Sequence, residues 1–263
     1  MRASIDDRVE QTQWDSFWLP SWAAVIDRPE LRYMRSDVDQ SVLNMVTRIR
    51  APHTNASLAT LVEEVDRAHR GVTSTWLLAP RSQLPGLPTL LKQAGWHIEP
   101  IHHLRTLPVD TPLSHAAAHL EVRQVLHEQT LIDCIRAGDA AFDKPTATLT
   151  PERLADELQS ARQGRVNRFV VYDRATGTPI SSAGVNLYPQ QGIGFLWGGG
   201  TIAEHRGRGA YRALVRARQR CARAAGCTHL AVYANAETSD PILASLGFER
   251  HSTLQIWRRP PTP

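Results

Sequence analysis

Hydrophobic and polar positions in the second half of the chain alternate in blocks that predict a mixed α/β fold. Short apolar runs bounded by turn residues predict strands at 120–125, 168–172, 180–187, 192–200, 229–233 and 249–257. Apolar residues at helical spacing predict helices at 129–142, 151–163, 209–224 and 240–246. Thr150 and Pro151 suit the N-cap and first turn of the second helix. The strands between 168 and 200 follow one another through short turns, so we expect a meander.

The first half of the chain shows a comparable order of elements. The pattern predicts strands at 42–49 and 74–79, helices at 58–69 and 87–94, and an extended segment that runs from Gly95-Trp96 to Leu107. Near the N-terminus, aromatic residues recur at helical intervals: Trp14, Phe17, Trp18 and Trp22. This stripe predicts a helix with one face in the core, although a roof over a substrate cleft or a dimer interface would use the same residues.

The helix at 209–224 has a clear division between apolar and basic positions. Its expected packing face consists of Ala210, Ala213, Leu214, Ala217, Cys221 and Ala224. The expected solvent-facing side carries the arginines Arg212, Arg216, Arg218, Arg220 and Arg223. Few aromatic residues are interleaved with these arginines, so the helix is no stacking platform for bases, and we expect no nucleic-acid partner.

Composition narrows the class of protein. The chain has 263 residues, 42% of them hydrophobic, which is enough for two cores, and no apolar run approaches the roughly 20 residues that span a bilayer. The N-terminal residues lack the apolar stretch of a secretion signal, so we expect a cytoplasmic protein without a membrane partner. Cys134, Cys221 and Cys227 are scattered, with no ligand spacing, so they are expected to be buried apolar residues rather than metal ligands.

The most informative segment joins an apolar strand to a helix through glycines and arginines between Phe195 and Val215. Glycines permit positive φ and close approach of a ligand, while the first turn of a helix leaves its N–H groups unpaired. Such a turn binds anions, and the formal net charge of +4 is compatible with an anionic ligand. It is neither a P-loop nor a dinucleotide fingerprint, because the lysine of the first and the glycine spacing of the second are absent.

The spacing Arg206-x-x-Gly209-x-Tyr211 resembles the R/Q-x-x-G-x-G/A pyrophosphate loop of the GNAT superfamily of N-acetyltransferases, whose cofactor is acetyl-coenzyme A. Tyr211 departs from this pattern, because Gly or Ala is usual there. The order of elements around the loop, with Gly247-Phe248 before the last strand, resembles the GNAT fold over about 119–258. The resemblance implies a mixed, mostly antiparallel twisted sheet flanked by helices.

The resemblance also implies a division of the chain. Residues 119–263 form the expected acetyltransferase domain, and residues 111–118 the linker. Residues 1–110 form a smaller domain, which we interpret as a degenerate GNAT-like domain because the stretch 50–55 has no glycine loop. An unrelated α/β module is the alternative for this first domain.

The resemblance assigns roles to particular residues. The implied coenzyme A-binding residues are Gly199, Gly200, Thr201, Arg206, Gly207, Arg208, Gly209, Ala210, Tyr211 and Asn235. A backbone N–H near Gly200 or Thr201 is the candidate oxyanion donor. Many family members carry a general-acid Tyr four residues before the glycine of Gly247-Phe248, but Leu243 stands there in this chain. Tyr233 and Ser239 are therefore the candidate catalytic residues.

The general base is less evident, because the strand at 192–200 contains no Asp, Glu or His. Ordered water is one route for the proton, and the other candidates are Asp143, Tyr188, Asp240 and His53. Two functions remain open: an acetyl-CoA-dependent N-acetyltransferase in which a small-molecule or peptide amine attacks the thioester directly, and a catalytically silent coenzyme A-binding regulator or sensor. No metal is expected, and a homodimer is compatible with either function.

Overall fold

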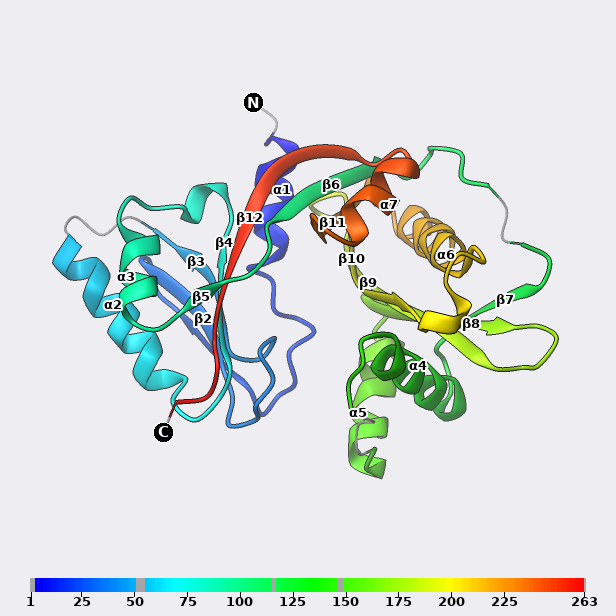
Figure 1. Ribbon diagram of the computed structural model, residues 1–263, viewed down its shortest axis with the longest axis horizontal. Coiled ribbons are helices and arrows are strands. Elements are labelled where there is room, and N and C mark those ends of the chain that lie inside the picture. Colours follow the sequence, from blue (N-terminus) through cyan, green and yellow to red (C-terminus); the bar gives the residue numbers. More distant parts are fainter. Residues whose placement is uncertain (1–2, 51–54, 115–116, 146–148, 263) are drawn as a thin grey trace. The chain divides into compact units, whose positions relative to one another are not determined.

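The computed structural model describes residues 3–50, 55–114, 117–145 and 149–262 (Figure 1). The chain divides into two compact units. The first unit consists of Met1–Arg105, Tyr233–Ser245 and Arg250–Pro263, and the second of Thr106–Val232 and Leu246–Glu249. Two C-terminal segments, Tyr233–Ser245 and Arg250–Pro263, therefore belong to the same unit as the N-terminal part of the chain. The linear division at 111–118 stays a prediction, and part of that linker lies outside the described residues.

The second unit is built on a sheet with the strand order β7-β8-β9-β10-β11. Its strands are β7 (Leu120–Gln124), β8 (Val166–Asp173), β9 (Pro179–Tyr188), β10 (Ile193–Thr201) and β11 (His229–Asn235), the last of which continues into the first unit. Neighbours from β7 to β10 are antiparallel, whereas β10 and β11 run parallel. The meander predicted between 168 and 200 is therefore confirmed.

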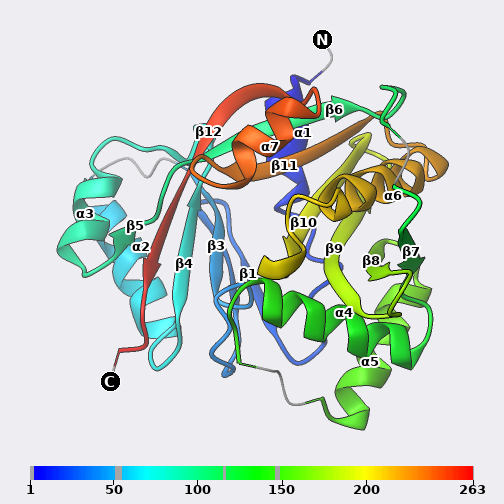
Figure 2. The same ribbon diagram turned by 45° about the vertical axis from the view of Figure 1, so that its right-hand side comes forward.

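Helices cover both faces of this sheet (Figure 2). They are α4 (Glu128–Ala141), α5 (Pro151–Arg162) and α6 (Ala210–Ala224), with a short 3-10 turn η2 (Ala203–His205) before α6. Thr150 caps α5 as predicted, since its hydroxyl accepts a hydrogen bond of 3.3 Å from Arg153 N. A Cβ at Gly199 would meet α6, and one at Gly200 would meet the C-terminal end of α4. Side chains therefore leave β10 alternately towards the two helical layers.

The buried face of α6 differs from the face that the sequence predicts. Ala210, Ala213, Leu214 and Ala217 are buried as expected, but Cys221 is only half-buried and Ala224 is exposed. The remaining buried positions of α6 are Val215, Arg218, Gln219 and Ala222. The prediction of an exposed Arg218 was therefore wrong, because Arg218 lies on the side of α6 that faces β9 and β10.

The first unit contains a sheet with the strand order β1-β2-β3-β4-β12. Its elements are α1 (Ile5–Thr12), β1 (Ala24–Asp27), β2 (Leu31–Arg35), β3 (Met45–Ile49), α2 (Asn55–Ala68), β4 (Ser74–Leu78), η1 (Pro80–Ser82), α3 (Leu87–Gln93), β5 (His97–Ile98), the start of β6 (His102–Pro108), α7 (Ser239–Ser245) and β12 (Glu249–Arg259). The C-terminal strand β12 lies antiparallel to β4, with Trp257 opposite Trp76.

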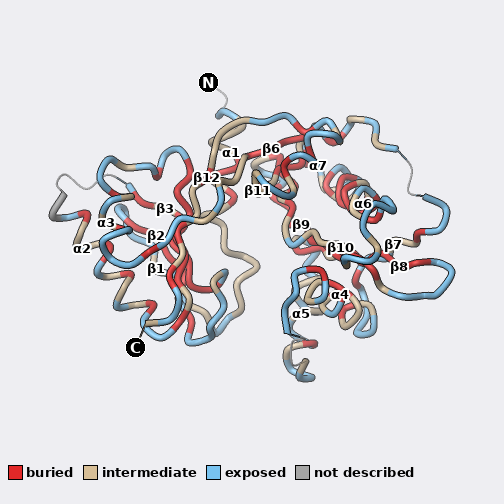
Figure 3. The backbone as a smooth tube through the Cα atoms, viewed as in Figure 1, coloured by how far each residue is buried: buried red, intermediate tan, exposed pale blue. Residues whose placement is uncertain are grey.

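Nearly every residue of β2, β3 and β4 is buried (Figure 3), so neighbouring positions that point to opposite faces of the sheet are both covered. On one side the core includes Trp76 and Trp96, whose rings meet edge to face at 5.9 Å between centroids. A second cluster contains Met34, Met45 and Leu254, against which Trp18 and Tyr233 pack. Burial on both faces explains why residues 76–79 form a continuous apolar run rather than an alternating one.

The predicted helix through the aromatic stripe was wrong. Helix α1 lies earlier, opened by a capping box between Ser4 and Asp7, and residues 13–23 form turns. Pro20 lies within that stretch, and proline in a helix interior removes a hydrogen bond and clashes with the preceding turn. Trp14 lies 5.6 Å from the Arg48 guanidinium, whereas Trp22 is largely exposed. The hairpin of β1 and β2 was not predicted.

Acid should destabilise the first unit through His69. Its ring is buried, Nε2 lies 2.8 Å from Met34 O and Nδ1 lies 2.5 Å from Ser74 Oγ. Burial lowers the pKa of His69 to about 4, so only the unfolded chain takes up this proton between its ordinary pKa near 6.5 and 4. Stability is therefore lost as pH falls through this window, by about 2 kcal/mol from pH 6.5 to 5.

Urea titrations followed by tryptophan fluorescence measure this loss, because Trp76 and Trp96 lie in the same core. His69→Gln is the reference protein, since it removes the titrating ring. A wild-type pH dependence equal to that of His69→Gln would refute the assignment.

Candidate functional site

The glycine loop between β10 and α6 has the backbone geometry that its sequence predicts. Gly207 has φ +74° and Gly209 has φ +84°, and Gly209 is the left-handed N-cap of α6. Residues that carry a side chain rarely adopt a positive φ, which explains why glycine occupies both positions. A Cβ at either glycine would meet no atom within 4 Å, so the loop presents open space to a ligand.

The backbone N–H groups of this loop lack protein acceptors. The first hydrogen bond of α6 runs from Ala213 N to Gly209 O at 3.0 Å. Within the described part of the chain, no acceptor faces the N–H groups of residues 207–212. Successive free N–H groups at a helix N-terminus, with the positive end of the helix dipole behind them, form an anion-binding site.

The two arginines of the loop differ in their contacts. Arg206 Nε donates to Thr201 O at 3.1 Å, and its side chain is otherwise exposed. Arg208 is held by Asp173, with 2.9 Å between Nη2 and Oδ2. The backbone N–H of Ala175, together with Arg208, keeps the pKa of Asp173 below its usual range. Arg206 is therefore the more available of the two for an anion.

The end of β10 forms a bulge next to the loop. Its register with β9 shifts between Trp197 and Gly200, and Gly198 has φ +57°. A Cβ at Gly200 would lie 2.9 Å from that of Ala141, closer than real Cβ contacts. The parallel pairing with β11 joins only residues 193–195 to 229–231 in the described chain, while β10 continues to Thr201. The glycines thus accommodate the close approach of α4 at a strand that leaves its parallel partner.

Tyr211, the departure from the family pattern, has a definite place in the second unit. Its Cε2 atom lies 3.0 Å from the position of a Cβ on Gly199. The Arg218 guanidinium lies 5.9 Å from the centre of the ring. The absence of a side chain at Gly199 makes room for the ring, and the N–H of Tyr211 remains part of the loop.

The first unit contains, among its described residues, four further candidates from the sequence: Tyr233, Asn235, Ser239 and Asp240. Tyr233 is well packed, and burial, with Glu10 and Asp6 nearby, raises the pKa of its phenol. Tyr233 therefore stays protonated near neutral pH, and its raised pKa makes it a weaker proton donor than an ordinary tyrosine. Ser239 is the first residue of α7, and Asn235 Oδ1 accepts from Glu237 N at 2.9 Å in a local turn.

Of the candidate bases, Asp240 is bound most firmly. Arg105 Nε and Nη2 lie 2.6 and 2.8 Å from its carboxylate oxygens, and the ion pair is buried. Arg105 lowers the pKa of Asp240, and His103 Nδ1 lies 3.1 Å away. A carboxylate held in this way is a poor proton acceptor. Sequence reasoning missed Arg105 and His103, because nothing local links them to a residue more than 130 positions away.

The other candidate bases are Asp143, Tyr188 and His53. Asp143 is exposed and has φ +50°, and Tyr188 is buried on β9. His53 lies outside the described residues. One buried carboxyl that the sequence did not single out is Glu10, whose Oε1 atom has no hydrogen-bond partner among the described residues. Burial raises the pKa of Glu10.

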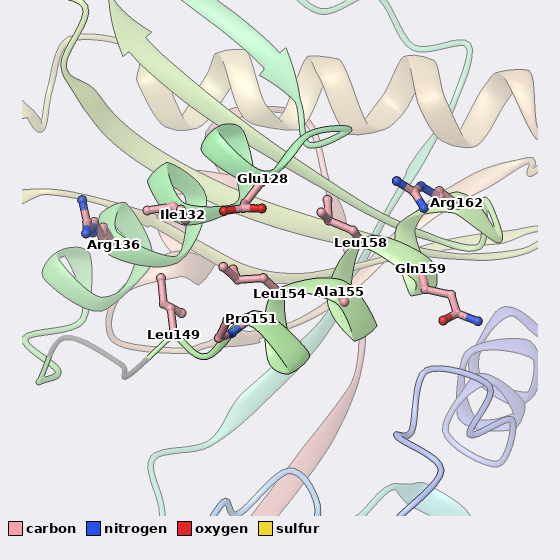
Figure 4. A pocket seen from close by; sticks show the side chains of 10 residues that line it. All are labelled: Glu128, Ile132, Arg136, Leu149, Pro151, Leu154, Ala155, Leu158, Gln159 and Arg162. Carbon is pink, nitrogen blue, oxygen red and sulfur yellow. The ribbon is translucent and has the colours of Figure 1, made fainter.

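A cavity of about 650 Å³ lies between α4 and α5 (Figure 4). Ile132, Leu154 and Leu158 contribute apolar side chains, and Arg136 and Arg162 lie at its margins. On α4 the cavity involves residues 128–136, whereas the β10 bulge contacts residues 141 and 142. At 1.5 Å per residue, these parts of α4 lie about 8 Å apart or more. The residues that line it all lie between 128 and 162, so the cavity is not part of the loop site.

The second unit is thus an α/β fold with a glycine loop whose N–H groups lack protein acceptors, at the junction of β10 and α6. Residues 137–248 match the model of the acetyltransferase (GNAT) family. The chain therefore carries a GNAT-family domain over these residues, which confirms the resemblance seen in the sequence. No protein with a curated description matches the chain significantly. Within the described residues, no helix is long and apolar enough to cross a membrane, and no cluster of three metal-ligating side chains occurs.

Solved structures are similar to nearly the whole chain. A GCN5-related N-acetyltransferase from Kribbella flavida aligns over 98% of this chain and 97% of its own, with 18% identity and a TM-score of 0.68. One from Sphaerobacter thermophilus covers 92% and 76%, with 17% identity and a TM-score of 0.63. A tandem GNAT protein from the clavulanic acid biosynthesis pathway covers 97% and 88%, with 18% identity and a TM-score of 0.58. The predicted mixed α/β fold is confirmed, and a GNAT-like N-terminal part agrees with the coverage of nearly the whole chain by a tandem GNAT protein.

Proposed function

We propose that the protein is an acetyl-CoA-dependent N-acetyltransferase. The observation that carries this proposal is the run of free N–H groups over residues 207–212, at the head of α6 in a GNAT domain. These groups fit the pyrophosphate of coenzyme A, and Arg206 adds a charge at the same loop. Gly199, Gly200 and Thr201 would hold the pantetheine arm, because the bulged strand offers backbone groups without bulky side chains. The thioester supplies the activated acetyl group.

Groups of this chain would assist both the attack on the thioester and the two proton transfers. A neutral amine attacks the thioester carbonyl, and a backbone N–H near Gly200 or Thr201 stabilises the developing oxyanion. Tyr233 and Ser239 are the candidates for returning a proton to the thiolate. Asp240 is not a good base because Arg105 binds its carboxylate, so we assign proton removal from the amine to ordered water.

The proposal also covers the acceptor, the partners and the location of the protein. We infer a small-molecule or peptide amine as acceptor, no metal, no membrane or nucleic-acid partner, and a cytoplasmic location. The GNAT-like domain is proposed to extend over 119–263 and the degenerate one over 1–110. A homodimer is compatible with this proposal.

A coenzyme A-binding regulator or sensor is the second candidate function. The observation in its favour is Leu243, which is fully buried where many family members have the general-acid tyrosine. A leucine side chain has no proton to exchange, so it cannot act as the general acid. The chemistry tolerates water as a relay, however, so we favour the enzyme.

Thiol release separates the two functions. The wild-type protein, acetyl-CoA and a panel of amino acids, polyamines, amino sugars and short peptides are incubated together, and free coenzyme A is measured. We expect at least one amine to raise thiol release at least tenfold above the rate without amine. Acetyl-CoA binding without release for any amine class would favour the sensor instead.

A further inference from the structure

Among the described residues, Arg218 is the largest charged side chain that is fully buried, with 1% of its surface exposed. Its Nε donates to Leu214 O of the same helix at 3.2 Å, and Nη1 donates to Gly184 O on β9 at 3.3 Å, so the side chain points towards the sheet. Its Nη2 atom has no hydrogen-bond partner among the described residues. Both Nη1 and Nη2 lie 3.6 Å from the position of a Cβ on Gly199.

No carboxylate neutralises this guanidinium within the described chain. Two other buried arginines differ in this respect, since Arg105 is paired with Asp240 and Arg259 with Asp66. Burial lowers the pKa of Arg218, and only Tyr211 opposes that effect. A buried cation without a counter-ion costs folding free energy that its two backbone hydrogen bonds only partly offset.

The charge lies close beneath the anion-binding loop. Side chains on a helix lean towards its N-terminus, and Arg218 follows this rule because its Nε reaches the carbonyl one turn earlier, at Leu214. The guanidinium therefore lies beside Tyr211, in the first turn of α6. From the helical rise, the charge is about 6–10 Å from the free N–H groups. Gly199 and the Tyr211 ring both lie against the guanidinium.

We propose that Arg218 is a buried positioning charge of the cofactor site, which strengthens binding of the anionic coenzyme A through the first turn of α6. This inference rests on the proposed function. A unit charge at about 10 Å, in an effective dielectric constant of about 20, changes affinity for one phosphate charge by roughly tenfold. The buried cation therefore lowers the stability of the ligand-free protein, and a bound anion offsets this loss by its attraction to the guanidinium.

The test measures coenzyme A affinity by calorimetry in the full chain. Arg218→Gln removes the charge and keeps a hydrogen-bonding group, and Arg218→Met removes both. Arg220→Gln is the matched control, because Arg220 lies on the same helix and is exposed. We expect about tenfold weaker binding for both Arg218 variants, and a change of less than about twofold for Arg220→Gln.

Salt and stability separate a charge effect from a packing effect. The ratio of wild-type to Arg218→Gln affinity should be similar at about 50 and about 500 mM salt, because a buried charge is poorly screened. The ligand-free Arg218→Met protein should melt at the wild-type temperature or above. Affinity within twofold of wild type, or misfolding of both variants, would overturn the proposal. If the wild type itself does not bind coenzyme A, the proposed function fails first.

Discussion

Gly209→Trp is expected to abolish coenzyme A binding, with affinity falling at least a hundredfold. Gly209 is the left-handed N-cap of α6 at φ +84°, so any side chain strains the loop. An indole at this position would also occupy the open space in front of the free N–H groups. A loss of two hydrogen-bonding N–H groups to a phosphate, at about 1.5–3 kcal/mol each, accounts for the expected size. Calorimetric titration with coenzyme A measures it.

Gly164→Trp is the matched control for this variant. Gly164 lies in the same unit, between α5 and β8, has φ +78°, and would meet no atom within 4 Å if given a Cβ. Its substitution imposes the same kind of backbone strain outside the loop. We expect the control to bind coenzyme A within about threefold of wild type. Equal loss in both variants would show that strain in the second unit, and not the loop, controls binding.

Asp240→Ala should lower the free energy of unfolding of the first unit by about 3 kcal/mol. The carboxylate and the Arg105 guanidinium form two hydrogen bonds in a buried setting, at 2.6 and 2.8 Å. Removing the carboxylate leaves a buried guanidinium without its anion. Urea unfolding followed by tryptophan fluorescence measures the change, because six of the seven tryptophans lie in this unit.

Glu99→Ala is the control, since its ion pair with Arg258 is at the surface. We expect a loss below about 1 kcal/mol there. The pKa of Asp240 is lowered, so its stabilisation is present above the ordinary carboxyl range and is lost as pH falls through the folded pKa. The difference between wild type and Asp240→Ala should therefore shrink in acid. A wild-type unfolding midpoint for Asp240→Ala would contradict this role.

Local signals in the sequence were sufficient to predict much of the second unit. Turn residues and apolar runs fix the strands between 166 and 201, and Gly207 and Gly209 predict the loop because only glycine adopts that backbone readily. Arg218 shows the limit of such patterns. Its charge placed it among the solvent-facing arginines, but its aliphatic stem and its position one turn after Leu214 allow burial.

Contacts between distant parts of the chain could not be predicted. The pairing of β12 with β4 places Trp257 opposite Trp76, and no local pattern specifies a partner so far away in sequence. The same holds for the ion pair of Arg105 and Asp240. In the N-terminal segment, the helical spacing of Trp14 and Trp18 was misleading, because Pro20 and the packing of Trp18 on the sheet outweigh periodicity.

Calorimetric titration of the wild-type protein with acetyl-CoA tests the central claim most directly. The free N–H groups at residues 207–212 predict saturable binding at one site per chain, with a dissociation constant in the micromolar range, about −8 kcal/mol. Coenzyme A should compete for the same site, because the loop contacts the pyrophosphate that both share. Absence of heat or competition up to roughly millimolar ligand would contradict the assignment of this loop and the function built on it.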